Sequence, residues 1–496
     1  MTLRPPPQFP SNPSAFALRF QISNLRLFLA LLFLAIFLCS PALALAQQPP
    51  AAAPTLASGV LHDRVITAED PGHSYALYLP SDYSPERRWP ILYAFDPAGR
   101  GAIPVSLLQT AAEEVGFIVA GSHNARNGPT ESLQQAADIL WRDTHARFSI
   151  DDSRVYLAGF SGTARFAAWL ALRCNCAAGV IAFGAGLPAP VPGPPQSPFA
   201  YFAAVGELDF NYPEVMQLRP QLEQWNLPYR LLAFNGAHDW APPDVWHEAL
   251  AWLELRAMKD GRILRDDKFI STAYRNGLEA ARQLEAAGDP EAAYEELIAL
   301  ARDFNGLTNT SAAAELLPRL ESSPELAQAR QRRAEAFALQ DSLTRGFVAN
   351  LVSFLRAPHQ REDLFAQLRT QARDLNARLT QPAAPHLAAA TRRAHSKAYL
   401  TAAELGQLRL DSGDPLLAVA CFELTAALVP DSPFPHFQQA RAHARAGNKT
   451  DALRALQRSL SLGFSDRALI EQTPDFDPLR DDPLFKSLLS RLPEQK

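Results

Sequence analysis

The alternation of apolar and polar positions divides the chain into two regions of different character. From about residue 58 to residue 260, short apolar runs alternate with segments of helical spacing. Several runs are apolar almost throughout, which is typical of strands buried on both faces of a sheet. The predicted strands span residues 74–80, 89–95, 116–122, 154–159, 178–186, 198–206 and 229–236. Strands that alternate with helices predict an α/β domain over 58–260, with a mostly parallel, doubly wound sheet covered by helices on both faces.

The strand pattern stops after about residue 265, and a helical periodicity rich in Ala, Leu, Arg, Glu and Gln follows. We therefore expect an all-α domain over residues 266–496. Within it, Gly413 and Gly447 occupy equivalent predicted turns, at the period of about 34 residues that is typical of the tetratricopeptide repeat. The tail resembles this repeat most clearly over 398–465, which implies contact with a protein partner through a concave helical surface. The alternative is an irregular helical bundle, and no repeats can be assigned over 306–395.

The first 46 residues have the pattern of a secretory signal. Three arginines precede an apolar segment at 27–38, and the small residues Ala44 and Ala46 follow it. The apolar segment is short for a membrane-spanning helix. We expect cleavage after Ala46, a Pro/Ala linker over 47–57, and an exported protein that is periplasmic or secreted and does not associate with a membrane. An uncleaved N-terminal anchor is the alternative.

Composition narrows the function classes further. Hydrophobic residues make up 47% of the chain, which indicates folded material, and the formal net charge is only −5. This small charge argues against nucleic acid or an anionic membrane surface as a partner. After signal cleavage three cysteines remain, Cys174, Cys176 and Cys421. We interpret them as buried free thiols, since three cysteines form no disulfide framework and the Cys-Asn-Cys pair lacks zinc partners. No metal, nucleotide or flavin motif is present, so no cofactor is predicted.

The segment Gly-Phe-Ser-Gly-Thr-Ala at 159–164 joins a predicted strand to a predicted helix. A nucleophilic serine is carried on such a sharp turn when the residues two before and two after it are small. Gly159 fits this pattern and Thr163 departs from it. Ser161 is therefore a candidate nucleophile, and the N–H of Gly162 is a candidate oxyanion-hole donor at the start of the helix. The alternative is that Ser161 merely caps a buried helix.

Two later residues complete a possible triad in the required order of serine, acid and histidine. Asp209 follows the predicted strand 198–206, and His238 follows the predicted strand 229–236. Parallel strands bring the loops after their carboxyl ends to one edge of the sheet. We expect His238 to take the proton of Ser161 and Asp209 to orient the imidazole ring. Taken singly, each residue could be structural, and the neighbouring acids Glu207 and Asp239 compete for the role of Asp209.

Two loops at the same predicted edge supply weaker candidates. The second oxyanion donor should come from the loop 96–101, where Pro97 has no N–H, so the N–H of Ala98 is the candidate. The loop 121–129 places Asn124 and Arg126 where they could line a substrate pocket. A purely structural role in the loop is the alternative for both.

These motifs resemble the α/β-hydrolase superfamily, in the style of secreted polyhydroxybutyrate depolymerase-like and feruloyl-esterase-like carboxylesterases. The resemblance covers residues 58–258 and implies hydrolysis of a small ester or polyester through an acyl-enzyme on Ser161. A serine peptidase or amidase on the same fold is an alternative, because the same chemistry cleaves amides. Another alternative is a catalytically inactive binding or scaffold protein, since Thr163 and the missing His-Gly start of the loop 96–101 depart from the family pattern.

Overall fold

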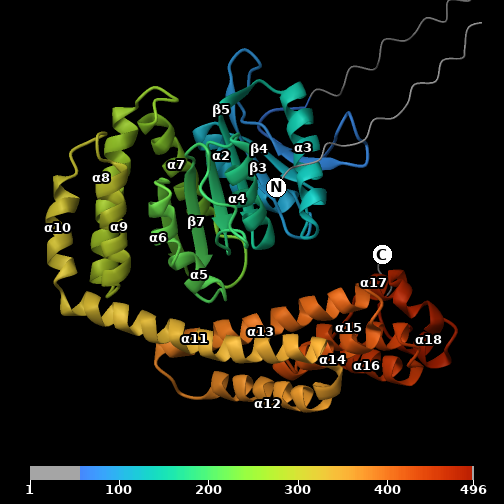
Figure 1. The fold of residues 1–496 in the computed structure, drawn as a ribbon. Coiled ribbons are helices and arrows are strands. Elements are labelled where there is room, and N and C mark those ends of the chain that lie inside the picture. The colour runs from blue at the N-terminus through green and yellow to red at the C-terminus, as the bar shows by residue number, and fades with distance from the viewer. Residues whose placement is uncertain (1–55, 494–496) are drawn as a thin grey trace, which may run out of the picture. The chain divides into compact units, whose positions relative to one another are not determined.

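The computed structural model describes residues 56–493, with only the backbone of residue 358. Residues 57–493 belong to one compact unit that contains the predicted sheet and the helices that follow it (Figure 1). The predicted signal segment and most of the linker lie outside the described residues. Within the described residues, no helix is both long enough and apolar enough to cross a membrane.

The sheet has eight strands in the order β1-β2-β4-β3-β5-β6-β7-β8. The strand β2 is antiparallel to its neighbours β1 and β4, and the remaining pairs are parallel. The strands are β1 (Leu61–Ile66), β2 (Ser74–Tyr78), β3 (Trp89–Phe95), β4 (Ile118–Ser122), β5 (Ile150–Phe160), β6 (Gly179–Phe183), β7 (Ala200–Gly206) and β8 (Tyr229–Phe234). This order, with the serine turn after a central strand, confirms the predicted α/β-hydrolase fold.

Seven of the strands were predicted, from continuous apolar runs or, at 74–80, from the alternation of Tyr75, Leu77 and Leu79. For example, every residue of β3, β4, β6 and β7 is buried. The strand β1 was not predicted, because it is an edge strand of mixed exposure and therefore has no regular apolar pattern.

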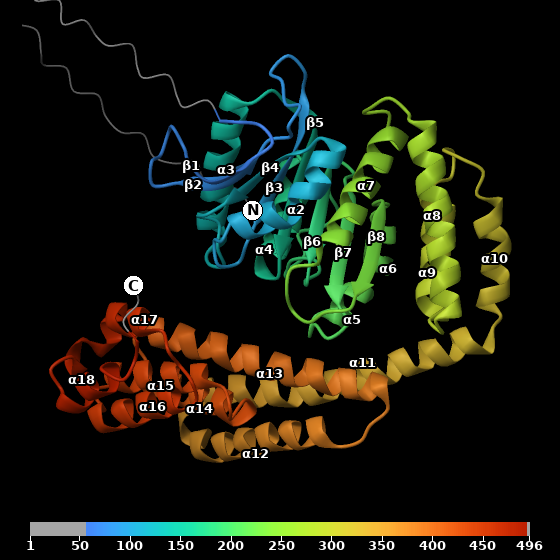
Figure 2. The same ribbon diagram turned by 180° about the vertical axis from the view of Figure 1, so that it is seen from behind.

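Helices cover both faces of the sheet, as the pattern predicted. The helices α2 (Ala102–Val115) and α7 (Pro243–Lys259) pack against one another on one face, and α3 (Thr130–Arg147) and α4 (Gly162–Cys174) lie on the other (Figures 1 and 2). The core between the sheet and the pair α2 and α7 contains large fully buried side chains such as Trp246. Two short helices, α5 (Tyr212–Met216) and α6 (Arg219–Gln224), connect β7 to β8.

The chain after α7 is helical, in agreement with the second predicted region. The helices are α8 (Asp267–Ala286), α9 (Pro290–Asp303), α10 (Ser311–Glu321), α11 (Pro324–Arg356), α12 (Arg361–Thr380), α13 (Pro385–Asp411), α14 (Pro415–Leu428), α15 (Pro433–Arg445), α16 (Lys449–Ser461), α17 (Arg467–Gln472) and α18 (Pro483–Leu489). Consecutive helices from α13 to α16 pack against one another. The domain boundary near residues 260–266 and the tetratricopeptide assignment stay predictions.

The turns between these helices explain why the repeat pattern is visible in the sequence. Gly413 and Gly447 both have left-handed backbone, with φ of 83° and 78°, which favours glycine because a side chain is strained there. In the first of these turns, the Asp414 side chain then accepts a hydrogen bond from the N–H of Leu417 and so caps α14. The same Gly-Asp-Pro turn starts α9, where Gly288 has a φ of 83°.

The cysteines correct one prediction. Cys174 and Cys176 are joined by a disulfide, with their Cα atoms 5.1 Å apart, and are not free thiols. The residue between them, Asn175, has a left-handed backbone with φ of 52°, and this tight turn brings the two side chains together. Cys421 is free and buried, as expected.

Candidate active site

Ser161 lies on the turn between β5 and α4 and has an unusual backbone. Its φ and ψ are 55° and −121°, outside the regions that L-residues favour, and such a conformation costs about 1–3 kcal/mol. The N–H of Ser161 donates to the carbonyl of Phe183, 2.8 Å away, which holds the turn against β6. The Ser161 side chain makes no capping hydrogen bond to α4. The geometry therefore favours a presented hydroxyl over a helix cap.

The turn requires a very close approach between β5 and α4. A Cβ atom on Gly159 would lie 2.3 Å from the carbonyl oxygen of Thr163, so no larger residue fits there. Thr163 is fully buried, and its hydroxyl lies 2.5 Å from the carbonyl oxygen of Phe95 and 2.8 Å from that of Phe160. The unexpected threonine thus bonds the ends of β3 and β5.

The structure brings Ser161, His238 and Asp209 together. The Nε2 atom of His238 is 2.9 Å from the Ser161 Oγ, and its Nδ1 atom is 2.8 Å from the Asp209 Oδ2. An ionised carboxylate only accepts hydrogen bonds, so Nδ1 carries the proton and Nε2 accepts from the serine hydroxyl. Asp209 is fully buried, and its second oxygen accepts from the N–H of Asn211 at 2.8 Å. This arrangement has the donor and acceptor order of a serine–histidine–aspartate triad.

Aromatic rings enclose the imidazole on two sides. The ring centroids of Phe160 and Phe210 lie 4.6 Å and 4.2 Å from that of His238. Both competing acids are exposed, and the Asp239 carboxylate accepts from the N–H of Trp240 instead. Among the described residues, Asp209 is the carboxylate that bonds His238.

The two predicted oxyanion donors differ in their surroundings. Within residues 56–493, the N–H of Gly162 has no hydrogen-bond acceptor, and it lies at the positive end of α4. The N–H of Ala98 already donates to Asp96 Oδ1 at 2.8 Å. Ala98 can therefore serve an oxyanion only if this hydrogen bond opens, and its role stays a prediction.

Asn127 is a neighbour of the nucleophile turn that the sequence analysis missed. A Cβ on Gly162 would lie 2.3 Å from the Asn127 Oδ1, so the side-chain amide packs directly on the Gly162 backbone. The N–H of Asn127 donates to the carbonyl of Pro97 at 2.8 Å, which joins this loop to the one after β3. No local pattern distinguished Asn127 from the other polar residues of the segment 121–129.

Asp96 organises two loops of the site. It is fully buried and accepts from the Trp240 Nε1 at 3.0 Å, so it connects the loop after β3 to the loop that carries His238. Its carboxylate also accepts from the N–H groups of Ala98 and Arg100 and from the Arg100 guanidinium. Burial alone would raise the pKa of Asp96, but the hydrogen bonds from Arg100, Trp240 and the backbone hold it below its ordinary value.

Asn124 and Arg126, which were predicted to line a substrate pocket, do not contact Ser161, Asp209 or His238 within the described part of the chain. The Asn124 amide accepts from the N–H of Ser74 at 3.0 Å and donates to the carbonyl of Gly72 at 3.0 Å, so it structures the loop before β2. Arg126 is exposed, and none of the contacts between described residues joins it to the triad.

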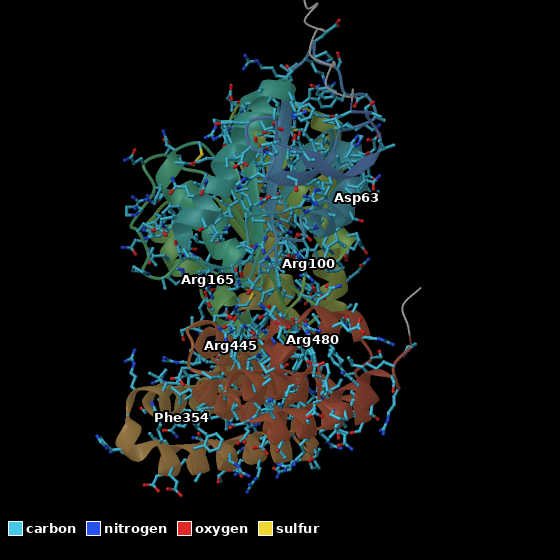
Figure 3. All side chains as sticks on the ribbon, turned by 90° about the vertical axis from the view of Figure 1, so that its right-hand side faces the viewer. Asp63, Arg100, Arg165, Phe354, Arg445 and Arg480 are labelled. Carbon is cyan, nitrogen blue, oxygen red and sulfur yellow. A yellow bond between two sulfur atoms is a disulfide. The ribbon has the colours of Figure 1, made fainter. Side chains whose placement is uncertain are left out.

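A cavity of about 530 Å³ opens beside the nucleophile turn. Gly162, Phe166 and Trp169 of α4 and the segment 188–192 line it. Arg165 also lines it and is held by Glu214 (Figure 3 labels Arg165). A group bound in this cavity would therefore lie next to Gly162, the residue after Ser161, against aromatic and proline side chains.

Comparisons with known proteins found likenesses only among solved structures. No family model and no curated protein matches the chain. Solved structures that it resembles include an S-formylglutathione hydrolase from Staphylococcus aureus (14% identity, 40% of this chain, 97% of that chain, TM-score 0.32). They also include an esterase from Pyrobaculum calidifontis (14%, 40% and 87%, TM-score 0.32). A third is the feruloyl esterase module from Clostridium thermocellum (16%, 38% and 85%, TM-score 0.30).

Proposed function

We propose that this protein is a serine hydrolase that cleaves carboxylic esters through an acyl-enzyme on Ser161. The observation that carries the proposal is the continuous hydrogen-bonded path from the Ser161 Oγ through His238 to Asp209, with distances of 2.9 Å and 2.8 Å. A serine hydroxyl is a weak nucleophile until a base within hydrogen-bond reach removes its proton. The strained turn presents that hydroxyl beside the cavity.

The geometry supports the following reaction. The Ser161 oxygen attacks the ester carbonyl carbon while His238 Nε2 takes the serine proton, and the negative charge of the tetrahedral intermediate develops beside the free N–H of Gly162. The imidazolium then protonates the leaving alcohol as the carbon–oxygen bond breaks. A water molecule attacks the acyl-enzyme with His238 again as base, which releases the acid and restores Ser161. Asp209 remains ionised and stabilises the imidazolium throughout.

Two further features extend the proposal. The disulfide between Cys174 and Cys176 supports export, because disulfides persist in oxidising compartments. The paired helices α13 to α16 support a protein-binding role for the helical region. The same acyl-enzyme chemistry would also serve a peptidase or amidase.

Replacement of Ser161 by Ala tests the proposal directly. We expect the full chain to hydrolyse p-nitrophenyl acetate and to react with a fluorophosphonate probe, and we expect Ser161→Ala to lose both activities by at least about 1,000-fold. Ser132→Ala, on the exposed start of α3, is the matched control and should keep both. A folded wild-type protein that neither hydrolyses esters nor takes the probe would instead support an inactive binding protein.

A further inference from the structure

Two side chains of the helical region reach the loop that carries Asp209. Arg393 of α13 donates from Nη1 to the carbonyl of Glu207 at 2.8 Å. Gln340 of α11 donates from Nε2 to the carbonyl of Phe210 at 2.7 Å. These two carbonyls lie on either side of Asp209 in the chain. Figures 1 and 2 show α11 and α13 running past the carboxyl end of the sheet, where this loop lies.

The two side chains form one rigid polar group. Arg393 Nε donates to Gln340 Oε1 at 2.6 Å, and the relative exposures are only 4% for Arg393 and 6% for Gln340. The Arg393 guanidinium also lies 4.9 Å over the ring of Tyr212, three residues beyond Asp209. A buried group of this kind, hydrogen-bonded to the backbone of a loop, fixes the relative position of the elements that it joins.

The Glu207 carboxylate attracts the buried guanidinium only from a longer distance, without a direct ion pair. Among the described residues, Arg393 forms no ion pair with a carboxylate, and its partners are a carbonyl, an amide and an aromatic ring. Burial of an unpaired charge is costly, so a simple adhesive role at this interface would be served better by apolar side chains. Arg393 and Gln340 instead donate hydrogen bonds to backbone carbonyls of the loop that carries Asp209.

The contact also extends to the imidazole. The ring of Phe210, whose carbonyl Gln340 binds, packs against His238 at a tilt of 37°, with ring centroids 4.2 Å apart. The ammonium group of Lys397, also on α13, lies 4.8 Å from the centroid of the same phenyl ring. A shift of the loop would therefore move both the carboxylate that orients His238 and the ring that packs against it.

We propose that Arg393 and Gln340 are positioning residues for the triad, so that the sheet and the helical region form a single catalytic unit. This inference rests on the proposed function. The helical region is then required for hydrolysis and is more than a removable attachment for partners. The helical region acts through the backbone of the loop that carries Asp209, which we call the acid loop. It touches neither substrate nor reacting atoms.

The test compares full-length variants on p-nitrophenyl acetate. We expect Arg393→Ala and Gln340→Leu to lower kcat by about 10- to 100-fold with KM changed less than about twofold, because small displacements of catalytic groups reduce turnover. The rate of fluorophosphonate inactivation should fall in parallel. Millimolar guanidinium should restore part of the kcat of Arg393→Ala, which a general loss of stability would not allow.

Glu295→Gln is the matched control, because it removes the ion pair with Arg219 between α9 and α6 without touching the acid loop. Its kcat should equal that of the wild type.

Folded Arg393 and Gln340 variants with wild-type kcat, or an equal loss in Glu295→Gln, would overturn the inference. If Arg393→Ala does not fold, Gln340→Leu decides alone. A wild-type chain without Ser161-dependent activity would remove the proposed function and this inference together, whereas an active wild type with unaffected variants removes the inference only.

Discussion

At the scale of single residues, Thr163 shows how a departure from a family pattern can be built into a fold. Glycine is usual two residues after the nucleophile because the helix passes close to the strand. Here the close approach is possible because Gly159 has no side chain. The threonine hydroxyl lies between the carbonyls of Phe95 and Phe160. The substitution that cast doubt on activity in the sequence therefore strengthens the turn.

Replacing Thr163 by Val should reveal this contribution. Valine keeps the branched shape but removes the hydroxyl whose one proton is shared between two nearby buried carbonyls, so we expect the free energy of unfolding to fall by about 1–3 kcal/mol. Urea denaturation followed by circular dichroism measures the change. Thr370→Val, which loses an exposed bond within α12, is the control and should cost clearly less. Equal costs for the two variants would contradict the role given to Thr163.

At the scale of elements, the loops after β3 and β8 depend on one carboxylate. Asp96→Asn replaces an acceptor by an amide whose NH₂ group must face the donors of Arg100 or Trp240. We expect a loss of about 2 kcal/mol in the free energy of unfolding at neutral pH, as is typical of hydrogen bonds to a charged group.

The pH dependence of this loss follows from the lowered pKa of Asp96. A carboxylate with a folded-state pKa below its unfolded value of 3.8 stabilises the protein fully above about pH 4, and less as the pH falls through the folded-state pKa. The difference in unfolding free energy between wild type and Asp96→Asn should therefore shrink in acid. Denaturation series at pH 7 and below pH 4 measure it, and a difference that grows on acidification would contradict this account.

The sequence predicted the elements better than the contacts between them. Buried strands are recognisable as apolar runs, and Ser161, Asp209 and His238 could be proposed together because each follows such a run. Asp96 and Asn127 were missed because their roles depend on how two loops meet, which no local pattern records. Gln340 and Arg393 lie in the helical region, and only the folded chain brings them to the acid loop. The disulfide was missed because it depends on the backbone of Asn175.

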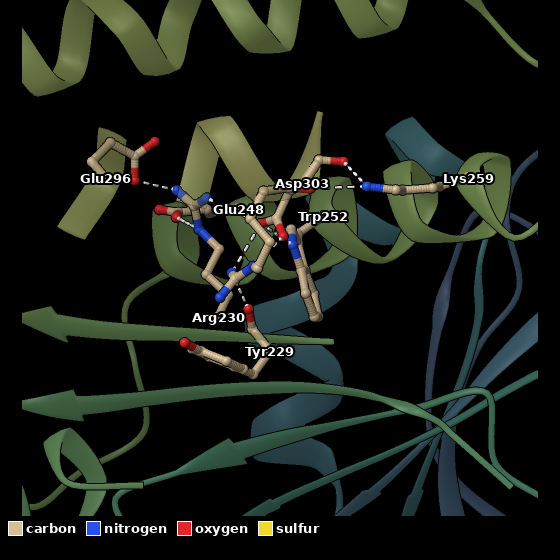
Figure 4. Close-up of polar contacts among 8 residues, drawn as sticks. Tyr229, Arg230, Glu248, Trp252, Lys259, Glu296 and Asp303 are labelled. Carbon is tan, nitrogen blue, oxygen red and sulfur yellow. Dashed lines mark hydrogen bonds and ion pairs between the residues drawn. The ribbon is translucent and has the colours of Figure 1, made fainter. Parts of the chain in front are cut away.

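At the scale of the whole molecule, the helical region also covers the exposed edge of the sheet. Arg230 of β8 bonds Glu248 of α7 at 2.8 Å and Glu296 of α9 at 2.5 Å, and Asp303 lies 3.9 Å away (Figure 4). Arg302 donates to the carbonyl of Tyr229 on the same strand. An edge strand otherwise offers unpaired backbone groups to other chains, so this network protects β8.

Removal of Arg230 should be costly. Its side chain is only 11% exposed, and Arg230→Ala would leave the carboxylates of Glu248 and Glu296 without their counter-ion. We expect a loss of about 3 kcal/mol in the free energy of unfolding, measured by thermal and urea denaturation. Arg345→Ala, which breaks the exposed pair with Asp341, is the control and should leave the melting temperature unchanged. A comparable melting temperature for both variants would show that the network contributes little.

The hydrogen bond between Arg393 and Glu207 joins residues 186 positions apart, and this separation has a consequence for synthesis. A ribosome releases the strands and all three triad residues long before it reaches α13. A nascent chain that has just completed its sheet thus carries the serine, the histidine and the aspartate without the support of the acid loop. With the positioning role proposed for Arg393, full turnover is therefore expected only after α13 has been made.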